Sequence, residues 1–419
     1  MRIGELSVIS DRILLALVAI FLFSSSVSGT AGSIFGGAAA IVFVVSSISF
    51  RRSFNFAHLK WFYLTVSLFV GWMIISALIT GIDSAALRAM RHEWIFALVP
   101  VVVFSLKNEH WSRHMVSVFA YGAGLMSLYS IGQFFWGWHF LKPGLKLEQH
   151  DFGYWIVGNF SGSVTFGIYF AVAAMFLIGY GLLGTKESND RSSLISLAAG
   201  LLATIAAVLS AERGPTVAVM TTLLVLVVLV RSKRVVTIFA VSVTTVVVVG
   251  LVSGVFARAG DLWKKELSML HDQGRLFIWT QSYKVASDNP IFGVGPGNFE
   301  NGYNAVLPTE PAGFVAQGHA HNDFLMYAAQ SGFPELIFFL LTWTSIIWLS
   351  WRAYHYTGGS ENTRRLALGA VLGSTCFFAT SMFDIPFGHS TTRQLLMFVW
   401  GAGIAAYLAY RKTASVGTD

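Results

Sequence analysis

The sequence predicts an all-α integral membrane protein with about twelve transmembrane helices. Hydrophobic residues make up 55% of the chain and charged residues only 12%, whereas soluble domains carry about 25% charged residues. The mean hydropathy is +0.64. Apolar runs of membrane length recur along the chain, and one long polar segment, residues 257–332, separates two groups of them. A soluble protein of this composition would expose apolar patches that promote aggregation.

A helix needs roughly 20 apolar residues to cross a bilayer. By this rule the predicted spans lie near residues 12–29, 34–50, 60–80, 93–106, 113–137, 162–184, 191–209, 215–231, 234–255, 333–351, 364–382 and 394–410. The first run resembles the apolar core of a signal peptide, but further spans follow at once, so we expect a retained helix. The run at 93–106 is short and the run at 34–50 is rich in Gly and Ala, so either could instead be re-entrant.

The charges predict how these spans are oriented. With a cytoplasmic N-terminus, every inside loop carries at least two positive charges, as the positive-inside rule requires. Both termini should then be cytoplasmic, and residues 257–332 should form an outward loop between spans 1–9 (residues 1–256) and spans 10–12 (residues 333–419). In a bacterium this loop would lie in the periplasm, at the inner membrane.

Composition also excludes several classes of function. The net charge of +7 is explained by basic cytoplasmic loops, and no basic stripe with interleaved aromatic residues indicates nucleic-acid binding. The single cysteine, Cys376, cannot form an intramolecular disulfide or a cysteine-based metal site. The acids of the long loop show no D-x-D spacing or cluster, which fits a site without a metal, and we expect no cofactor. A transporter is disfavoured because matching broken helices and charges within spans are missing.

Five basic residues in the shorter outward segments are candidate substrate contacts. Arg88 and Arg91 share one helical turn, where they either snorkel from an interfacial helix or bind a ligand. Lys142 and Lys146 lie among aromatic residues, which either anchor the chain at the membrane interface or stack on sugar rings. These lysines could meet an anionic lipid head. Arg393, in the last outward turn, could contact a phosphate.

Two further arginines lie close to predicted helix starts. Arg213 follows Glu212 at the mouth of a span, where it is either a paired topological charge or a clamp for phosphate, which the planar guanidinium suits. Arg275 opens a helix predicted over 274–287, where backbone amides already favour an anion, so this cation needs an anion or a carboxylate beside it.

The rest of the long loop supplies other candidates. An amphipathic helix that lies along the membrane is predicted over 261–270. Trp279 stands one turn after Arg275 and is a candidate substrate contact. The sequence GVGPGNF, which contains the further candidate Asn298, predicts an irregular turn whose glycines let the backbone approach a ligand or another segment. This turn matches neither the dinucleotide fingerprint nor the phosphate-binding loop.

The run His319-Ala-His321-Asn322-Asp323 predicts a helix start that carries His321 on one helical face. The helix dipole disfavours a cationic histidine at this end. A neutral histidine near pH 7 is what a general base requires. The alternative is that His321 only caps and packs the helix. Asn322, beside it, is a candidate substrate contact.

Taken in order, these motifs resemble the O-antigen ligase/polymerase superfamily of bacterial membrane glycosyltransferases. The resemblance lies in AERGP after an apolar span, in GR-x3-W followed by NPIFGVGPGNF, and in HAHNDFL followed by AAQSGFPEL. It covers roughly residues 200–345 in motif and the whole chain in architecture. Each motif alone is loose, whereas three in order in a multi-span protein are more specific.

The resemblance implies a metal-independent enzyme whose partners are a donor O-antigen on undecaprenyl pyrophosphate, a lipid A–core acceptor and membrane lipids. By motif position, Arg213 and Arg275 would bind the pyrophosphate and His321 would be the catalytic base, with His319 as the alternative base. We expect a ligase. Relatives that polymerise O-antigen or glycosylate proteins share the motifs, and a lipid-linked glycan transporter is the non-enzymatic alternative.

The chemistry of a sugar pyrophosphate agrees with this small set of residues. The leaving group departs as a stable anion, so no strong general acid is required. One base contributes about 10²–10⁴-fold to the rate. Preorganised cations that face the developing charge often lower the reaction barrier more than any other group in an active site. A single displacement predicts inversion at the anomeric carbon.

Overall fold

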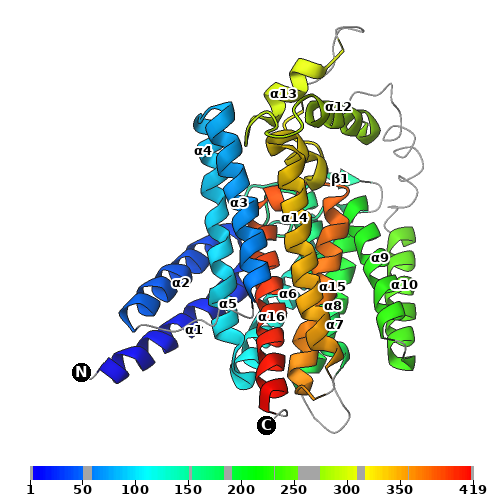
Figure 1. The fold of residues 1–419 in the computed structure, drawn as a ribbon. Coiled ribbons are helices and arrows are strands. Elements are labelled where there is room, and N and C mark those ends of the chain that lie inside the picture. The colour runs from blue at the N-terminus through cyan, green and yellow to red at the C-terminus, as the bar shows by residue number, and fades with distance from the viewer. Residues whose placement is uncertain are drawn as a thin grey trace.

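The computed structural model describes residues 3–50, 59–150, 153–183, 191–230, 232–252, 274–308, 317–356 and 358–416. Apart from the two-residue strands β1 (Gln149–His150) and β2 (Gly153–Tyr154), its regular elements are helices, which confirms the all-α fold (Figure 1). Among these described residues, eight helical segments are long and apolar enough to cross a membrane, and the apolar helices Arg213–Leu229 and Val235–Leu251 are shorter. The protein is therefore a multi-pass membrane protein, while the number of twelve spans stays a prediction.

Every predicted span overlaps a helix of the structure. These helices are α1 (Ile3–Val27), α2 (Gly29–Ser49), α3 (Lys60–Thr80), α5 (Leu98–Leu106), α6 (Glu109–Trp136), α7 (Ser163–Leu182), α8 (Arg191–Leu209), α9 (Arg213–Leu229), α10 (Lys233–Val252), α14 (Asp323–His355), α15 (Glu361–Ser381) and α16 (Ser390–Val416). The short run at 93–106 is extended by α4 (Ser84–Arg91) and the 3₁₀ helix η2 (His92–Ala97), so one helical segment runs from 84 to 106.

Helix α7 lies at the centre of the bundle, where it packs against α8 and α15 and is buried almost along its whole length. Small residues allow the close approach that membrane helices use in place of a hydrophobic driving force. A Cβ atom on Gly179 of α7 would lie only 2.9 Å from the Cα atom of Gly369 on α15. The backbones of these two helices therefore approach each other closely in the buried centre of the bundle.

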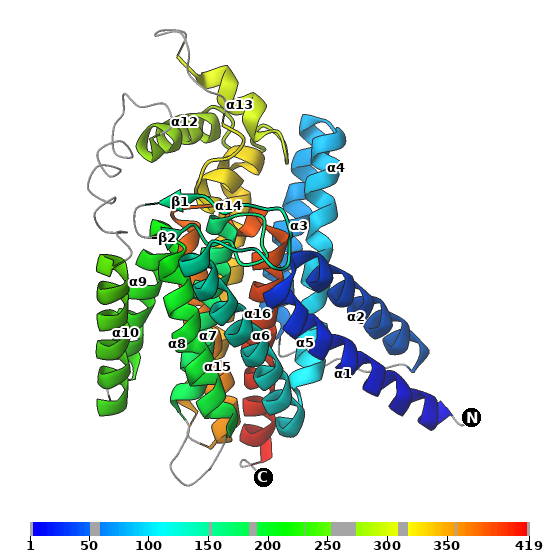
Figure 2. The ribbon, with the colours of Figure 1, turned by 180° about the vertical axis from the view of Figure 1, so that it is seen from behind.

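The two ends of the bundle differ in character. Helices α12 (Arg275–Asp288) and α13 (Phe299–Val306), α4 and the β strands lie at one end, whereas both chain termini lie at the other (Figures 1 and 2). The helix predicted over 274–287 is confirmed as α12. The amphipathic helix predicted over 261–270 lies outside the described residues. Helices α1 and α2 form a hairpin that leans away from the other helices (Figure 2).

The glycine-rich turn packs against a kink in α14. The helical path breaks at Ser331 and Gly332, and Gly332 has a φ of 82°. The freed backbone groups bond to the turn, since the Phe333 amide donates to the Pro290 carbonyl (2.9 Å) and the Gly295 amide donates to the Gln330 carbonyl (2.8 Å). The glycines of GVGPGNF thus allow the approach of another segment of the chain.

Replacing Gly332 with alanine should destabilise the protein strongly. A Cβ atom at this position would lie 2.1 Å from the Ile291 carbonyl oxygen, and a φ of 82° strains any L-residue. We expect the free energy of unfolding to fall by at least about 1–3 kcal/mol, the cost of backbone strain alone. Thermal unfolding in detergent measures this effect. Gly71→Ala in α3 is the control, because nothing lies within 4 Å of its new methyl group, and an equal loss in both variants would contradict the prediction.

Candidate functional site

The candidate site forms where the segment before α14 meets the loop between α15 and α16. The imidazole rings of His319 and His321 lie 4.1 Å apart between centroids. His321 Nδ1 lies 3.7 Å from the Oδ1 atom of Asp384, a carboxylate in the 382–389 loop that is almost completely buried. The sequence thus brings two predicted histidines together, and the fold adds an acid that the sequence analysis missed.

His321 is placed differently from the prediction. Helix α14 begins only at Asp323, and Asn322 is its N-cap, whose side-chain oxygen accepts a hydrogen bond from the Leu325 amide (3.0 Å). His321 therefore precedes the helix, and its φ of 48° is left-handed, which non-glycine residues rarely adopt. The prediction that His321 lies on a helical face was wrong because Asn322 is a strong cap. The unusual backbone holds the imidazole beside Asp384.

Three predicted residues fix the backbone around this pair. Asn322 Nδ2 donates to the Met382 carbonyl (3.1 Å), and the Arg275 guanidinium donates to the Phe383 carbonyl. Trp279 Nε1 donates to the His321 carbonyl (3.4 Å). The structure therefore brings α12, the start of α14 and the 382–389 loop into one unit. A guanidinium carries five N–H groups, so Arg275 can hold this carbonyl and bond to other acceptors at the same time.

Asp323 links the last residue of α15 to the 382–389 loop. Its carboxylate is buried and its Oδ2 atom accepts hydrogen bonds from the Ser381 hydroxyl (2.8 Å) and the Phe387 amide (3.2 Å). Buried hydrogen bonds to a carboxylate are strong and directional. Asp323 is therefore a positioning residue that sets where the loop presents Asp384.

Arg213 is the first residue of α9, and the segment before it contacts the same loop. Its neighbour Glu212 accepts a hydrogen bond from the Ser163 hydroxyl (2.6 Å). A Cβ atom on Gly214 would lie 3.2 Å from the Cβ atom of Phe383, so α9 begins directly against the loop. We call the place where the starts of α9 and α12 meet the 382–389 loop the junction. The sequence left open whether Arg213 is a topological charge or an anion clamp, and its place at the junction agrees with the second alternative.

The charges at the junction influence one another. Burial raises the pKa of Glu212, as does the charge of Asp384, while Arg275 and Arg213 act in the opposite direction. Burial also works to raise the pKa of Asp384, but contact with His321, the Ile385 amide and the charge of Arg275 outweigh it, so this pKa lies below its ordinary value. Asp384 is thus a carboxylate at neutral pH, beside two histidines and close enough to Arg275 to be influenced by its charge.

Two other histidines of the site, His319 beside His321 and His389 in the 382–389 loop, are kept neutral. Burial, together with the neighbouring His321, lowers the pKa of His319 to about 4. Burial also lowers the pKa of His389, although Asp384 partly opposes this shift. Since neither ring is charged at neutral pH, neither repels a proton that arrives on His321.

The lowered pKa of His319 makes the protein acid-sensitive. His319 binds a proton near pH 6.5 in the unfolded chain but only near pH 4 in the folded chain. Its contribution to the free energy of unfolding is therefore fully present above pH 6.5 and is lost as the pH drops toward 4. We expect the unfolding temperature of the wild type to decrease between pH 7 and pH 5. His319→Gln should show a smaller decrease, and equal decreases in both proteins would contradict the prediction.

The other predicted contacts lie away from this pair. Arg88 and Arg91 are in the last turn of α4, where a cation complements the helix dipole. Arg393 is buried and forms an ion pair with Glu93 (2.6 Å), so the structure gives it a partner within the protein.

The remaining three candidates lie in surface loops. Asn298 donates to the Asp83 carboxylate (3.0 Å) and ties the glycine-rich turn to the start of α4. Lys142 donates to the Phe160 carbonyl (3.2 Å), and Lys146 is exposed. None of the six candidates outside the junction is joined to His321 or Asp384 by a contact in the described part of the chain.

The histidine pair and Asp384 also satisfy the spacing of a metal site. One ligand atom from each of His319, His321 and Asp384 lies within 4.8 Å of the others. A cation held there would meet the positive charge of Arg275, which influences both His319 and Asp384. Because a guanidinium so close opposes a divalent cation, the arrangement is better suited to proton transfer beside an anionic ligand.

A family model described as O-antigen ligase matches residues 197–340. The match includes Arg213, Arg275, His319 and His321, while Asp384 lies beyond it. A comparison with curated proteins gives no match. The matched residues contain the three motifs and the helices that position them. The match confirms the expected similarity to the O-antigen ligase superfamily over these residues, about a third of the chain.

Proposed function

We propose that the protein is an O-antigen ligase that transfers a glycan from undecaprenyl pyrophosphate to a sugar hydroxyl of lipid A–core. The observation that carries this proposal is the pairing of His321 with the buried Asp384 at a junction that Arg213 and Arg275 share. The bias of basic residues toward the loops on the side of the termini supports a periplasmic site in the bacterial inner membrane.

In the proposed reaction His321 removes the proton from the acceptor hydroxyl. The hydroxyl oxygen forms a bond to the anomeric carbon as the bond from that carbon to the pyrophosphate oxygen breaks. The proton stays on His321, where the carboxylate of Asp384, 3.7 Å away, stabilises the imidazolium. Attack from the face opposite the leaving group inverts the anomeric configuration.

Arg213 and Arg275 supply the second half of the chemistry. The pyrophosphate gains negative charge as the glycosidic bond breaks, and two fixed guanidinium groups stabilise that charge without rearranging. Because the undecaprenyl pyrophosphate leaves as a stable anion, no general acid is needed to protonate it. This agrees with the neutral His319 and the ionised Asp384.

The proposal requires no metal, and chelation tests this point. Purified enzyme in EDTA should retain its full rate of transfer, since two arginines neutralise the pyrophosphate charge that a metal cation would otherwise neutralise. Loss of activity in EDTA, restored by a divalent cation, would instead assign His319, His321 and Asp384 to a metal site. A product with retained anomeric configuration would also overturn the single displacement.

The function itself is tested in cells by an electrophoretic analysis of lipopolysaccharide. A deletion strain complemented with His321→Ala should show lipid A–core without O-antigen, and the glycan should accumulate on its polyprenyl carrier. The wild-type gene should restore the ladder. Core that carries a single repeat unit would identify a polymerase. An unchanged ladder would contradict both and favour transfer to protein or a role in transport.

A further inference from the structure

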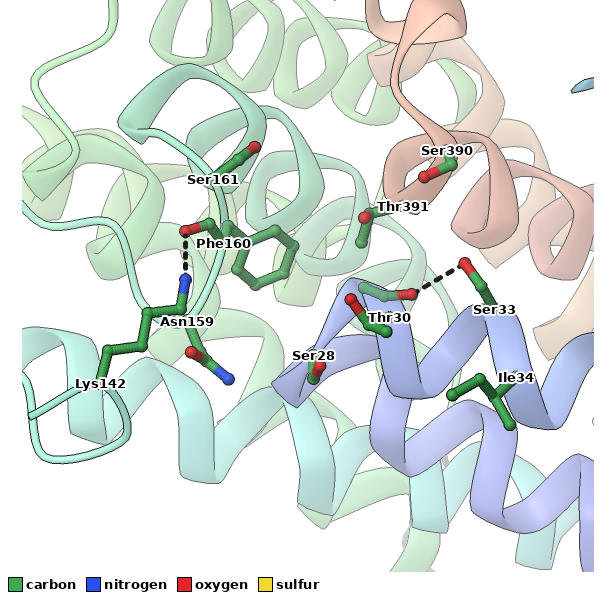
Figure 3. Close-up of a pocket in the computed structure, with 11 residues that line it drawn as sticks. Ser28, Thr30, Ser33, Ile34, Lys142, Asn159, Phe160, Ser161, Ser390 and Thr391 are labelled. Carbon is green, nitrogen blue, oxygen red and sulfur yellow. Dashed lines mark hydrogen bonds between the residues drawn. The ribbon is translucent and has the colours of Figure 1, made fainter. Parts of the chain in front are cut away.

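A second polar region lies at the same end of the bundle as the histidine pair. A cavity of about 490 Å³ opens between the turn of the α1–α2 hairpin, the loop before α7 and the start of α16 (Figure 3). Hydroxyl groups from two separate segments line it, those of Ser28, Thr30, Ser33, Ser390 and Thr391, together with the ammonium group of Lys142. Such a lining suits a ligand that is rich in hydroxyl or phosphate oxygens.

A neighbouring cavity of about 390 Å³ extends this region toward α4. It shares Ser33 and Ser390 with the first cavity and adds Arg91 and Trp94. We call the two cavities together the hairpin groove. Ser390 directly follows His389, which Asp384 influences electrostatically. The hairpin groove therefore borders the same loop that presents Asp384 to His321.

The groove offers a cation that can donate further hydrogen bonds. Lys142 donates one hydrogen bond to the Phe160 carbonyl (3.2 Å), and an ammonium has three donors. Gln394 is completely buried and donates to the Ser33 hydroxyl (2.6 Å), so it ties the start of α16 to α2 beside the groove.

An apolar surface continues from the groove along α2. Ile34 lines the cavity and is 62% exposed, and Ile41 and Val45 on the same helix are 67% and 58% exposed. Since α2 leans away from the other helices (Figure 2), these side chains face the space that lipid fills in a membrane. A molecule with a polar head in the groove could therefore lay its acyl chains along α2.

We propose that the hairpin groove binds the phosphorylated sugar head of the acceptor glycolipid, with the acyl chains along α2. This inference rests on the proposed function, which requires two lipid-linked substrates. The donor pyrophosphate is assigned to Arg213 and Arg275 at the α9–α12 junction, so the acceptor must reach His321 from elsewhere. The groove provides that second entrance, and Arg91 and Lys142 at its two ends match a phosphate-bearing head.

The test measures binding to the full-length protein in nanodiscs, with lipid A, dephosphorylated lipid A and undecaprenyl pyrophosphate as separate probes. Thr30→Trp fills the groove and should weaken lipid A binding at least tenfold. Lys142→Met should weaken binding of lipid A more than that of its dephosphorylated form. Leu194→Trp, at an exposed position of α8, and Lys284→Met, an exposed lysine on α12, line neither cavity; they are the matched controls and should leave binding within twofold of the wild type.

The outcomes separate this inference from the proposed function. Unchanged lipid A binding in both groove variants overturns the inference, and so does a selective loss of undecaprenyl pyrophosphate, which would assign the groove to the donor. Because binding is measured without turnover, the result does not depend on transfer activity. If the groove variants lose lipid A while His321→Ala retains full transfer, the proposed mechanism fails and the groove remains an acceptor site.

Discussion

Replacing His321 with alanine is expected to lower the kcat for glycan transfer by about 10²–10⁴-fold, the contribution of a positioned general base. Its side chain faces the ionised Asp384 and makes no hydrogen bond that holds the fold in the described structure. The KM values for both lipid-linked substrates should therefore change little. The measurement is steady-state transfer by purified enzyme. His114→Ala, an exposed histidine at the start of α6, is the control and should retain wild-type rates.

Asp384→Asn distinguishes a base from a residue that only shapes the site. Removing the carboxylate takes away the charge that stabilises the imidazolium, so the base becomes weaker and the acidic limb of the kcat/KM profile moves to lower pH. A merely structural role would lower the rate at every pH without moving this limb.

If His319→Ala reduces kcat more than His321→Ala does, the base is His319 and the assignment of the two histidines must be exchanged.

The sequence predicts the helices of this protein well, because membrane-length apolar runs are a strong local signal. It also predicts which motifs carry the site. It misses Asp384, since this residue stands about 60 positions after the histidines and only the packing of α15 beside α14 brings them together. Its position five residues before His389, in a turn that the charge pattern predicts to face outward, was the available clue.

Other differences come from tertiary contacts that no local pattern contains. Arg393 was predicted to lie in an outward turn, and the structure buries it against Glu93, 300 residues earlier in the chain, while its contact with substrate stays a prediction. The glycine-rich turn was compatible with a ligand or with another segment, and only the kink at Gly332 shows which one it approaches. Both features depend on the arrangement of helices far apart in sequence.

Replacing Arg275 with alanine is expected to lower kcat/KM for the lipid-linked donor by about 10²–10³-fold, the usual effect of removing one preorganised donor that faces developing charge. Arg275 opens α12, donates to the Phe383 carbonyl and influences both Glu212 and Asp384. Lys284→Ala, an exposed cation on the same helix, is the matched control and should keep the wild-type value, because its charge lies outside the junction.

Arg275→Lys separates the charge of the guanidinium from its geometry. Lysine keeps the positive charge but cannot form a planar fork to a phosphate, so we expect activity between the alanine variant and the wild type. Inhibition by inorganic pyrophosphate reports directly on anion binding, and its inhibition constant should rise in both variants. If the constant stays unchanged while the unfolding temperature falls, Arg275 acts only by holding Phe383. The pyrophosphate site would then have to be built around Arg213, because that arginine begins α9 against the same loop.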